Sequence, residues 1–263
     1  MKIGITKGDS PLILAQPHGG TEIPDDIFTR LNANGQAKQD TDWHITRLYE
    51  GLIEQATVVN TSIHRYVIDA NRDPSGQSLY PGQYTTGLCP TTTFDDLPLY
   101  IEGQTPSLDE MAYRQRQYHQ PYHDALCEQL ERVHQRHGYV VLYDCHSIRS
   151  VVPCLFDGKL PDLNIGTNDG TSCDQQIFES VESTCATSSH YSHVSNGRFK
   201  GGWTTRHYGK PNAGYHAIQM ELSQCNYMQE NHPWHYDTAK AQNLRILLKR
   251  ILENCLVSYN RPG

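Results

Sequence analysis

The stretch Tyr139-Val140-Val141-Leu142-Tyr143 is an unbroken run of apolar, β-branched and aromatic residues. Such a run is typical of a strand that is buried on both faces inside a sheet. Polar residues follow it at once, in Asp144-Cys145-His146-Ser147. We therefore predict a central strand whose carboxyl end carries side chains suited to chemistry.

A second apolar run ends in the same way. Leu12-Ile13-Leu14-Ala15 leads directly into Gln16-Pro17-His18-Gly19-Gly20, which is the pattern of a buried strand that stops at a loop. Ligands of open α/β sheets bind beyond the carboxyl ends of the strands. We therefore expect His18 and His146 to lie close together.

The remaining elements alternate between helical and strand-like patterns. Further strands are predicted at Thr57 to Ser62, Tyr66 to Ala70, Asp162 to Gly166, Ser192 to Ser195 and Ala217 to Leu222, and helices at Pro24 to Leu31, Asp42 to Ala56, Ser107 to His137 with a break at Pro121, Asp174 to Ser183 and Thr238 to Leu256. Residues 73–106 show no clear period, and so long a connection indicates an active-site or lid loop. This alternation predicts an α/β fold with a parallel or mixed sheet between helices. Without a repeat or linker, residues 1–263 are expected to form one domain.

Composition excludes several classes of protein. The chain has 263 residues, 37% of them hydrophobic, which is enough for a sizeable core. Its net charge is −7 and its pI about 6.0, with scattered Lys and Arg, so no nucleic-acid partner is expected. The sequence lacks an apolar run of membrane-spanning length and a signal-peptide pattern, which favours a cytoplasmic protein without a membrane partner. The eight cysteines form no C-x-x-C pair and are expected to be reduced.

The two strand-end histidines indicate a metal site. Catalytic zinc is held by three protein ligands, usually histidines with a carboxylate, and keeps a fourth position for water. His18 and His146 are the predicted histidine ligands, and Asp144 is placed to orient the second of them. Two carboxylates compete for the third position, Glu22 and Asp42, and the local sequence leaves that choice open.

Two other segments carry candidate catalytic groups. Arg65 and Arg72 bracket an apolar stretch, with Asn71 beside the second arginine. Arginine binds carboxylates through paired hydrogen bonds, so this segment is suited to an acidic substrate. Glu221 stands in an otherwise apolar strand, where burial raises a carboxyl pKa and suits a general base.

Seven blocks together resemble the N-formylglutamate deformylase family, and they span nearly the whole chain. They are Pro17-His18-x-Gly20, Asp40-Thr41-Asp42-Trp43-His44, Arg65-Tyr66-Val67-Ile68-Asp69-x-Asn71-Arg72, Asp144-x-His146-Ser147-Ile148-Arg149-Ser150, Asn164-Ile165-Gly166-Thr167-Asn168-Asp169-Gly170, Gly197-Arg198-Phe199-Lys200-Gly201-Gly202 and Gln219-x-Glu221-Leu222. The resemblance implies hydrolysis of N-formylglutamate to formate and glutamate, at the end of a histidine-degradation route. It also implies the fold of zinc carboxypeptidases and aspartoacylase, a three-layer structure with a mixed sheet of about eight strands between helices.

The resemblance also implies a role for each candidate residue. One Zn²⁺ ion is expected on His18, His146 and Asp42, because position 21 is Thr and the chain departs from the His-x-x-Glu pair of carboxypeptidase-like enzymes. Glu221 is the expected general base and Arg65 the expected oxyanion group. Asn71 and Arg72 match the positions that bind one substrate carboxylate, and Arg206 is expected to bind the other.

Two alternative functions remain open at this point. The first is a zinc deacylase or carboxypeptidase that acts on another N-acyl amino acid or a peptide end. The second is a non-catalytic metal-binding protein on the same scaffold. A candidate base, oxyanion group and substrate clamp in one chain favour an enzyme for a small acidic N-acyl amino acid.

Overall fold

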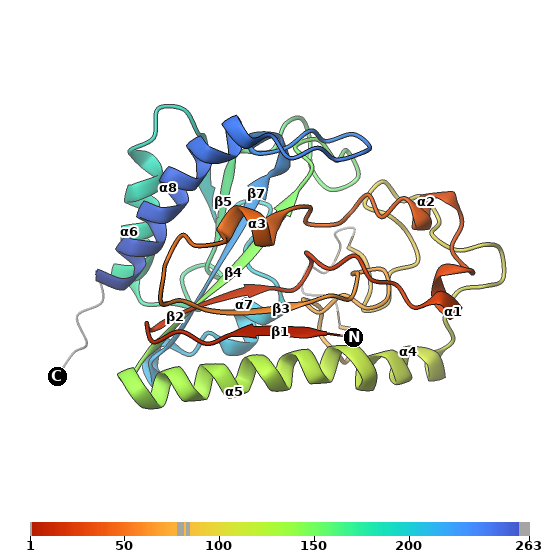
Figure 1. Cartoon of the computed structure of the whole chain (residues 1–263), viewed down its shortest axis with the longest axis horizontal. Helices are drawn as coiled ribbons and strands as arrows, with labels where there is room; N and C mark the ends of the chain where they lie inside the picture. The colour runs from red at the N-terminus through yellow and green to blue at the C-terminus, as the bar shows by residue number, and fades with distance from the viewer. Residues whose placement is uncertain (1, 78–81, 83–84, 258–263) are drawn as a thin grey trace.

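A computed structural model describes residues 2–77, 82 and 85–257, and its centre is a mixed β-sheet (Figure 1). The described residues form seven strands in the order β1-β3-β2-β4-β7-β5-β6. Their bounds are β1 Ile3–Thr6, β2 Leu12–Gln16, β3 Thr57–Thr61, β4 Val140–Ile148, β5 Leu163–Gly166, β6 His193–Ser195 and β7 Tyr215–Ser223. The four strands β3, β2, β4 and β7 run parallel to one another. At the two ends of this group, β1 pairs antiparallel with β3, and β5 pairs antiparallel with β7.

Helices cover both faces of the sheet, so the expected three-layer α/β fold is confirmed (Figure 1). The helices are α1 Asp25–Phe28, α2 Ala33–Gln36, α3 Ile45–Tyr49, α4 Leu108–Arg114, α5 Gln120–His137, α6 Gln175–Ala186, α7 Trp203–Tyr208 and α8 Thr238–Val257, with a π-helical turn at Gln115–His119 and 3-10 turns at Pro211–Ala213 and Gln224–Asn226. α5 and α7 pack on one face, and α3, α6 and α8 cover the other. Among the described residues, no helix combines the length and apolarity needed to cross a membrane.

The two cores follow from the alternation of side chains along β2. Leu12 and Leu14 point into the core beneath α3, α6 and α8, whereas Ile13 and Ala15 point into the core against α5. Successive residues of a strand face opposite sides of the sheet, so a strand between two helical layers has to be apolar at every position. The prediction of a buried strand at Leu12 to Ala15 is therefore confirmed.

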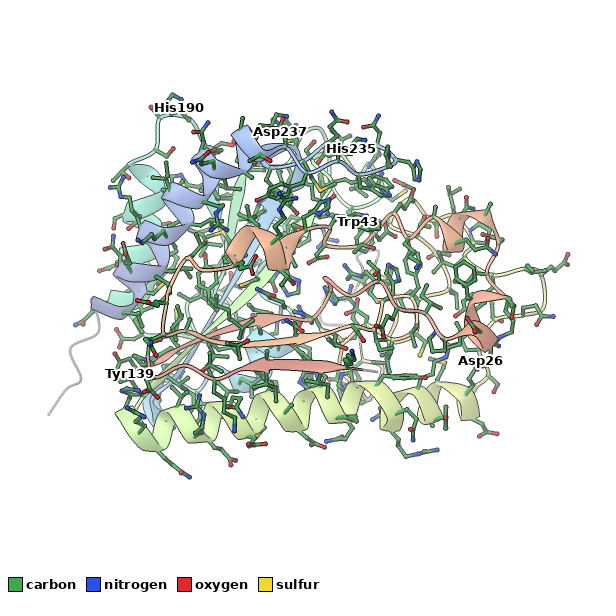
Figure 2. The ribbon with its side chains drawn as sticks, in the orientation of Figure 1. Asp26, Trp43, Tyr139, His190, His235 and Asp237 are labelled. Carbon is green, nitrogen blue, oxygen red and sulfur yellow. The ribbon has the colours of Figure 1, made fainter. Side chains whose placement is uncertain are left out.

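β4 is longer than its apolar run predicts, and this extension positions the candidate site. The strand continues through Asp144 and His146 to Ile148, and it pairs with β7 in parallel over nine residue pairs. In this register His146 lies beside Glu221. Tyr139, labelled in Figure 2, directly precedes β4 and marks its amino end, whereas His146 lies near the carboxyl end of the strand at Ile148.

Two predicted elements are wrong; local side-chain hydrogen bonds explain the first, and left-handed backbone conformations explain the second. The expected strand from Tyr66 to Ala70 is a series of turns, because the amide N–H of Tyr66 donates to His64 and that of Asn71 to Asp69; such local bonds compete with sheet pairing. The expected helix from Asp42 to Ala56 is reduced to α3, since His44 precedes it in a left-handed conformation and Gly51 follows with φ of 68°.

Candidate active site

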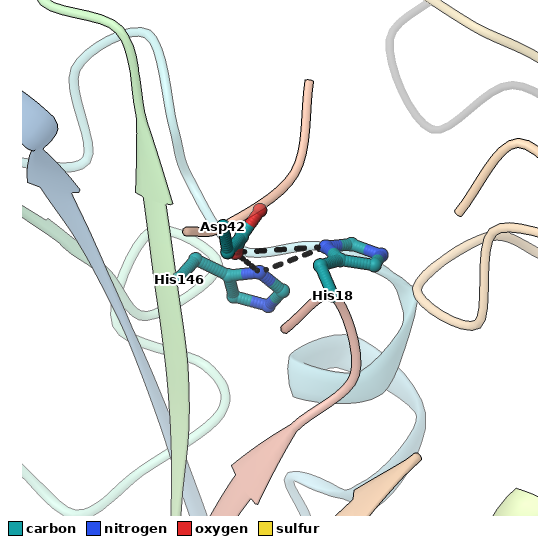
Figure 3. A group of neighbouring side chains, drawn as sticks. All are labelled: His18, Asp42 and His146. Carbon is teal, nitrogen blue, oxygen red and sulfur yellow. Dashed lines mark hydrogen bonds and ion pairs between the residues drawn. The ribbon is translucent and has the colours of Figure 1, made fainter. Parts of the chain in front are cut away.

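Three acceptor atoms meet at the carboxyl ends of β2 and β4 (Figure 3). The Nδ1 atoms of His18 and His146 are 3.1 Å apart, and Oδ2 of Asp42 lies 3.2 Å from Nδ1 of His146 and 3.8 Å from that of His18. All three side chains are buried. The amide N–H of Asp42 donates to the carbonyl of His18, which joins the two loops that carry them.

The structure brings Asp42, and not Glu22, to the two histidines. Glu22 is exposed, and its carboxylate accepts a hydrogen bond from the hydroxyl of Ser62 at 2.6 Å. Asp42 Oδ2 instead accepts a hydrogen bond from the amide of Ser147, just after His146, at 3.0 Å. Of the two carboxylates that the sequence left open, only Asp42 is therefore available to a metal between the histidines.

The partners of the opposite ring nitrogens show that this donor set fits a divalent metal. Nε2 of His18 lies 2.7 Å from Asp69, and Nε2 of His146 lies 3.1 Å from Oδ1 of Asp144. That Oδ1 atom is buried and has no hydrogen-bond partner among the described residues. A proton on Nε2 of His18 is shared with Asp69 and leaves the Nδ1 lone pair of that ring for a cation, and the charge of Asp144 beside Nε2 of His146 favours the same tautomer there, as in carboxylate–histidine–zinc arrangements.

Distances and charges agree with this assignment. Zinc–ligand bonds of about 2.0–2.1 Å in tetrahedral geometry separate ligand atoms by about 3.3 Å, close to the three distances observed here. Although burial alone lowers the pKa of His146, the charge of Asp144 and hydrogen bonds to Asp144 and Asp42 raise it well above its ordinary value. Positive charge is thus favoured at His146, whereas burial and the charge of Arg65 lower the pKa of His18.

Asp69 connects the histidine pair to the predicted substrate clamp. Its Oδ1 accepts hydrogen bonds from His18 and from the amide of Asn71, and its Oδ2 accepts one from Arg65 at 2.8 Å. Burial opposes ionisation, but the charges of Arg72, His18 and Arg65 hold the pKa of Asp69 well below its ordinary value. Sequence patterns assigned Asp69 no role of its own, although its position between two arginines was a usable signal.

Arg65 joins Asp42 and Asp69, two of the carboxylates that contact the histidines. Its Nη1 donates to Oδ1 of Asp42 at 3.3 Å while its Nη2 bonds Asp69. The guanidinium carbon also lies 4.7 Å from the centre of the Phe94 ring. Arg65 therefore presents a fixed, buried positive charge beside the candidate metal ligands.

Glu221 is buried on β7, beside His146. Removal from water, reinforced by the charge of Asp42, raises its pKa to about 8. The side-chain N–H of Gln219 donates to Oε2 of Glu221 at 3.2 Å. Oε1 of the same Gln219 side chain accepts a hydrogen bond from the backbone N–H of Gly202 at 2.7 Å. Gln219, which the sequence did not single out, thus links the candidate base to the Gly-rich loop.

One cavity joins these groups. It is lined by His18, Arg65, Asn71, Arg72, Thr85, Thr86, Phe94, His146, Ile148, Leu155, Arg198, Phe199, Gly202, Gln219 and Glu221. This lining contains three arginines and a single carboxylate, a balance that favours an anionic ligand. Most of the sequence-predicted residues are therefore brought together around a common space.

The predicted clamp residues differ in how they are held. Arg72 donates from Nε to the carbonyl of Thr86 at 2.9 Å and from Nη2 to its hydroxyl at 3.1 Å. Asn71 accepts from the amide of Thr204, and its amide nitrogen lies 3.0 Å from Nε2 of His146. Arg206 is not part of the cavity lining among the described residues, because it lies on α7 and its Nε donates to the carbonyl of Gly201.

Comparison with known proteins shows the family. The model of the family described as N-formylglutamate amidohydrolase matches residues 10–228. The chain belongs to this family. It is 44% identical to an N-formylglutamate deformylase of Pseudomonas aeruginosa over 97% of this chain and 96% of that protein, and 44% identical to one of Pseudomonas putida over 95% and 94%.

Solved structures agree with the family assignment. A crystal structure of an N-formylglutamate amidohydrolase from Ralstonia eutropha superposes with a TM-score of 0.80 at 25% identity, covering 96% of each chain. A protein from Agrobacterium tumefaciens shares the fold with a TM-score of 0.73 at 19% identity, covering 97% of this chain and 95% of that one. The resemblance of the seven sequence blocks is thereby confirmed at the level of family and fold.

Proposed function

We propose that this chain is a zinc-dependent amidohydrolase that converts N-formyl-L-glutamate to formate and L-glutamate, the last step of a histidine-degradation route. The observation that carries the proposal is the placement of Glu221 beside the His18, Asp42 and His146 cluster, in a cavity lined by three arginines. The names of the Pseudomonas relatives support the choice of substrate.

The metal ligands in this proposal are His18, His146 and Asp42. When bound there, zinc supplies Lewis acidity toward water and toward the formyl oxygen. Asp69 and Asp144 hold the ring protons of the two histidines on Nε2 and so keep Nδ1 available. Asp42 is kept ionised by Arg65 and by the two histidines, although burial opposes its charge.

Glu221 acts as the general base and then as the general acid. It removes a proton from the water whose oxygen attacks the formyl carbon, and it delivers that proton to the amide nitrogen as the carbon–nitrogen bond breaks. The raised pKa of Glu221 suits both transfers near neutral pH. Gln219 orients the carboxylate through its amide hydrogen bond.

The arginines bind and stabilise negative charge. Arg65 is fixed by Asp42 and Asp69 next to the reacting carbonyl, where it stabilises the developing oxyanion. Arg72, assisted by Asn71, binds the substrate carboxylate next to the formamide, because its planar guanidinium matches a carboxylate. The substrate class is therefore a small N-acyl amino acid with at least one carboxylate.

The proposal is tested with Glu221→Gln, which keeps the shape of the side chain but removes its basicity. We expect formate release from N-formylglutamate to fall by about 10²- to 10⁴-fold, the usual contribution of proton transfer by a positioned group. The zinc content measured by elemental analysis should remain that of the unaltered chain. Glu253→Gln, an exposed change on α8, serves as the matched control. Near-full turnover by a zinc-loaded Glu221→Gln variant would contradict the proposed role.

A further inference from the structure

We infer that Arg198 binds the second, distal carboxylate of the substrate and so sets selectivity for a dicarboxylic N-acyl amino acid. The inference rests on the proposed function, because it assigns a subsite within the same cavity. Arg198 lies on the loop between β6 and α7, and it is the third arginine of the cavity lining.

The other two arginines are grouped around Asp69. Arg65 bonds Asp69 at 2.8 Å, and the guanidinium of Arg72 lies 3.8 Å from the same carboxylate. Both therefore belong to the metal end of the cavity. Arg198 comes from a different part of the chain, and its Nε donates to the carbonyl of Leu155 at 2.7 Å. A guanidinium can contact a carboxylate at two points because its N–H groups lie in one plane.

Part of the cavity lining is apolar and contacts two of these cations, since Phe94 lies against Arg65 and Phe199 against Arg198. Four hydrophobic residues of the lining belong to one cluster, and they are Phe94, Ile148, Leu155 and Phe199. A wall of this kind favours methylene groups and disfavours charge. The side chain of glutamate combines apolar methylene groups with a terminal charge, since two methylene groups separate its carboxylate from the α-carbon.

Charge balance favours Arg198 over the arginine that the sequence suggested. A substrate with two carboxylates needs a cationic partner for each when it leaves water. Arg206 lies on α7 outside the lining, with its Nε on the carbonyl of Gly201. Because both arginines follow β6 within a short stretch, Arg206 is also a natural control for Arg198.

The test compares two substrates that differ only in the distal charge. N-formylglutamate has a carboxylate where N-formylglutamine has a neutral amide of nearly the same shape. We expect Arg198→Met to lower kcat/KM for N-formylglutamate by roughly 100-fold, because it removes a charge-assisted contact. The same variant should change kcat/KM for N-formylglutamine by less than about threefold.

Controls separate recognition from structural damage. Arg206→Met should leave the ratio of the two kcat/KM values unchanged, and Arg198→Lys should restore part of the preference, since it keeps the charge without the planar fork. Zinc content and melting temperature are measured for every variant, and retained turnover of N-formylglutamine shows that the site is intact.

Three outcomes would overturn the inference. They are an equal loss on both substrates with Arg198→Met, an unchanged substrate ratio in that variant, and a change of the ratio with Arg206→Met. Failure of the proposed function looks different, because the unaltered, zinc-loaded chain would then release no formate from N-formylglutamate. An active parent with an Arg198→Met variant of unchanged selectivity therefore contradicts the assignment of Arg198 alone.

Discussion

Two groups of buried histidines among the described residues differ in the atoms that their ring nitrogens contact. In the metal cluster, His18 and His146 each place Nε2 beside a carboxylate and direct Nδ1 toward one another. In the second group, Nε2 of His119 donates to the carbonyl of Arg72 at 3.1 Å and Nε2 of His123 donates to that of Ala70 at 2.7 Å. The partner atoms, and not the histidines themselves, distinguish the two sites.

The second group is an aromatic cradle, made of His119, His123, Trp203, His207 and Tyr208. The rings of His123 and Trp203 lie 4.6 Å apart, and Trp203 stacks on His207 at 4.2 Å. Burial lowers the pKa of both His119 and His123, so these rings are neutral. Both groups contact the segment from Asp69 to Arg72: the metal cluster contacts the Asp69 carboxylate, and the cradle contacts the carbonyls of Ala70 and Arg72. One site is arranged for positive charge, and the other supports the backbone beside it.

The largest effect is expected from exchanging a metal-cluster histidine and a cradle histidine for glutamine. His146→Gln should abolish stoichiometric zinc binding and lower turnover by at least about 10³-fold, because the several kcal/mol that a metal contributes to the transition state are lost. His119→Gln should retain its zinc after dialysis against a chelator that strips His146→Gln. Elemental analysis and formate release measure both results. Equal zinc loss in the two variants would erase the proposed distinction.

A smaller effect is expected from Asp69, the carboxylate that contacts Nε2 of His18. Asp69→Asn removes the charge that holds the proton on Nε2 of His18, and outer partners of this kind change metal affinity by about 10- to 100-fold. We expect weaker zinc binding in a competition titration with a chelating dye. Asp73→Asn, nearby on the same segment, is the control and should bind zinc as the parent does. Unchanged affinity in Asp69→Asn would show that the carboxylate does not support the metal.

Sequence patterns predicted the parts of this site that depend on strands. Because His18 and His146 follow apolar runs, the pattern placed them at the carboxyl ends of strands, and it placed Glu221 inside a strand. The β4–β7 register that sets His146 beside Glu221 is a tertiary property that neither strand encodes by itself.

Strand patterns could not predict the parts of the site that loops position. The turns around Asp69 arise from local side-chain hydrogen bonds that outweigh the strand propensity of Val67 and Ile68. The choice of Asp42 over Glu22 depends on a backbone contact between distant loops. Arg198 and Arg206 share one basic stretch, and only the path of that loop separates the cavity-lining residue from the other.

The smallest expected effect concerns acid stability and the cradle. Burial and the neighbouring His119 lower the pKa of His123 from its ordinary 6.5 to about 3. His123 therefore stays neutral in the folded protein, whereas the unfolded chain takes up a proton there as the pH falls below about 6.5. The free energy of unfolding should consequently fall on acidification, by about 0.8 kcal/mol at pH 6 from this residue.

This effect can be isolated with His123→Gln, whose amide N–H is suited to the same Ala70 carbonyl but does not titrate. The variant should be less stable at every pH because it loses ring contacts with Trp203. Between pH 7.5 and pH 6, however, the parent should lose about 0.8 kcal/mol more than the variant in denaturant unfolding at equal zinc loading. Parallel stability curves would mean that the cradle already accepts a proton at His123. The contrast with the metal cluster would then lie in geometry and not in charge.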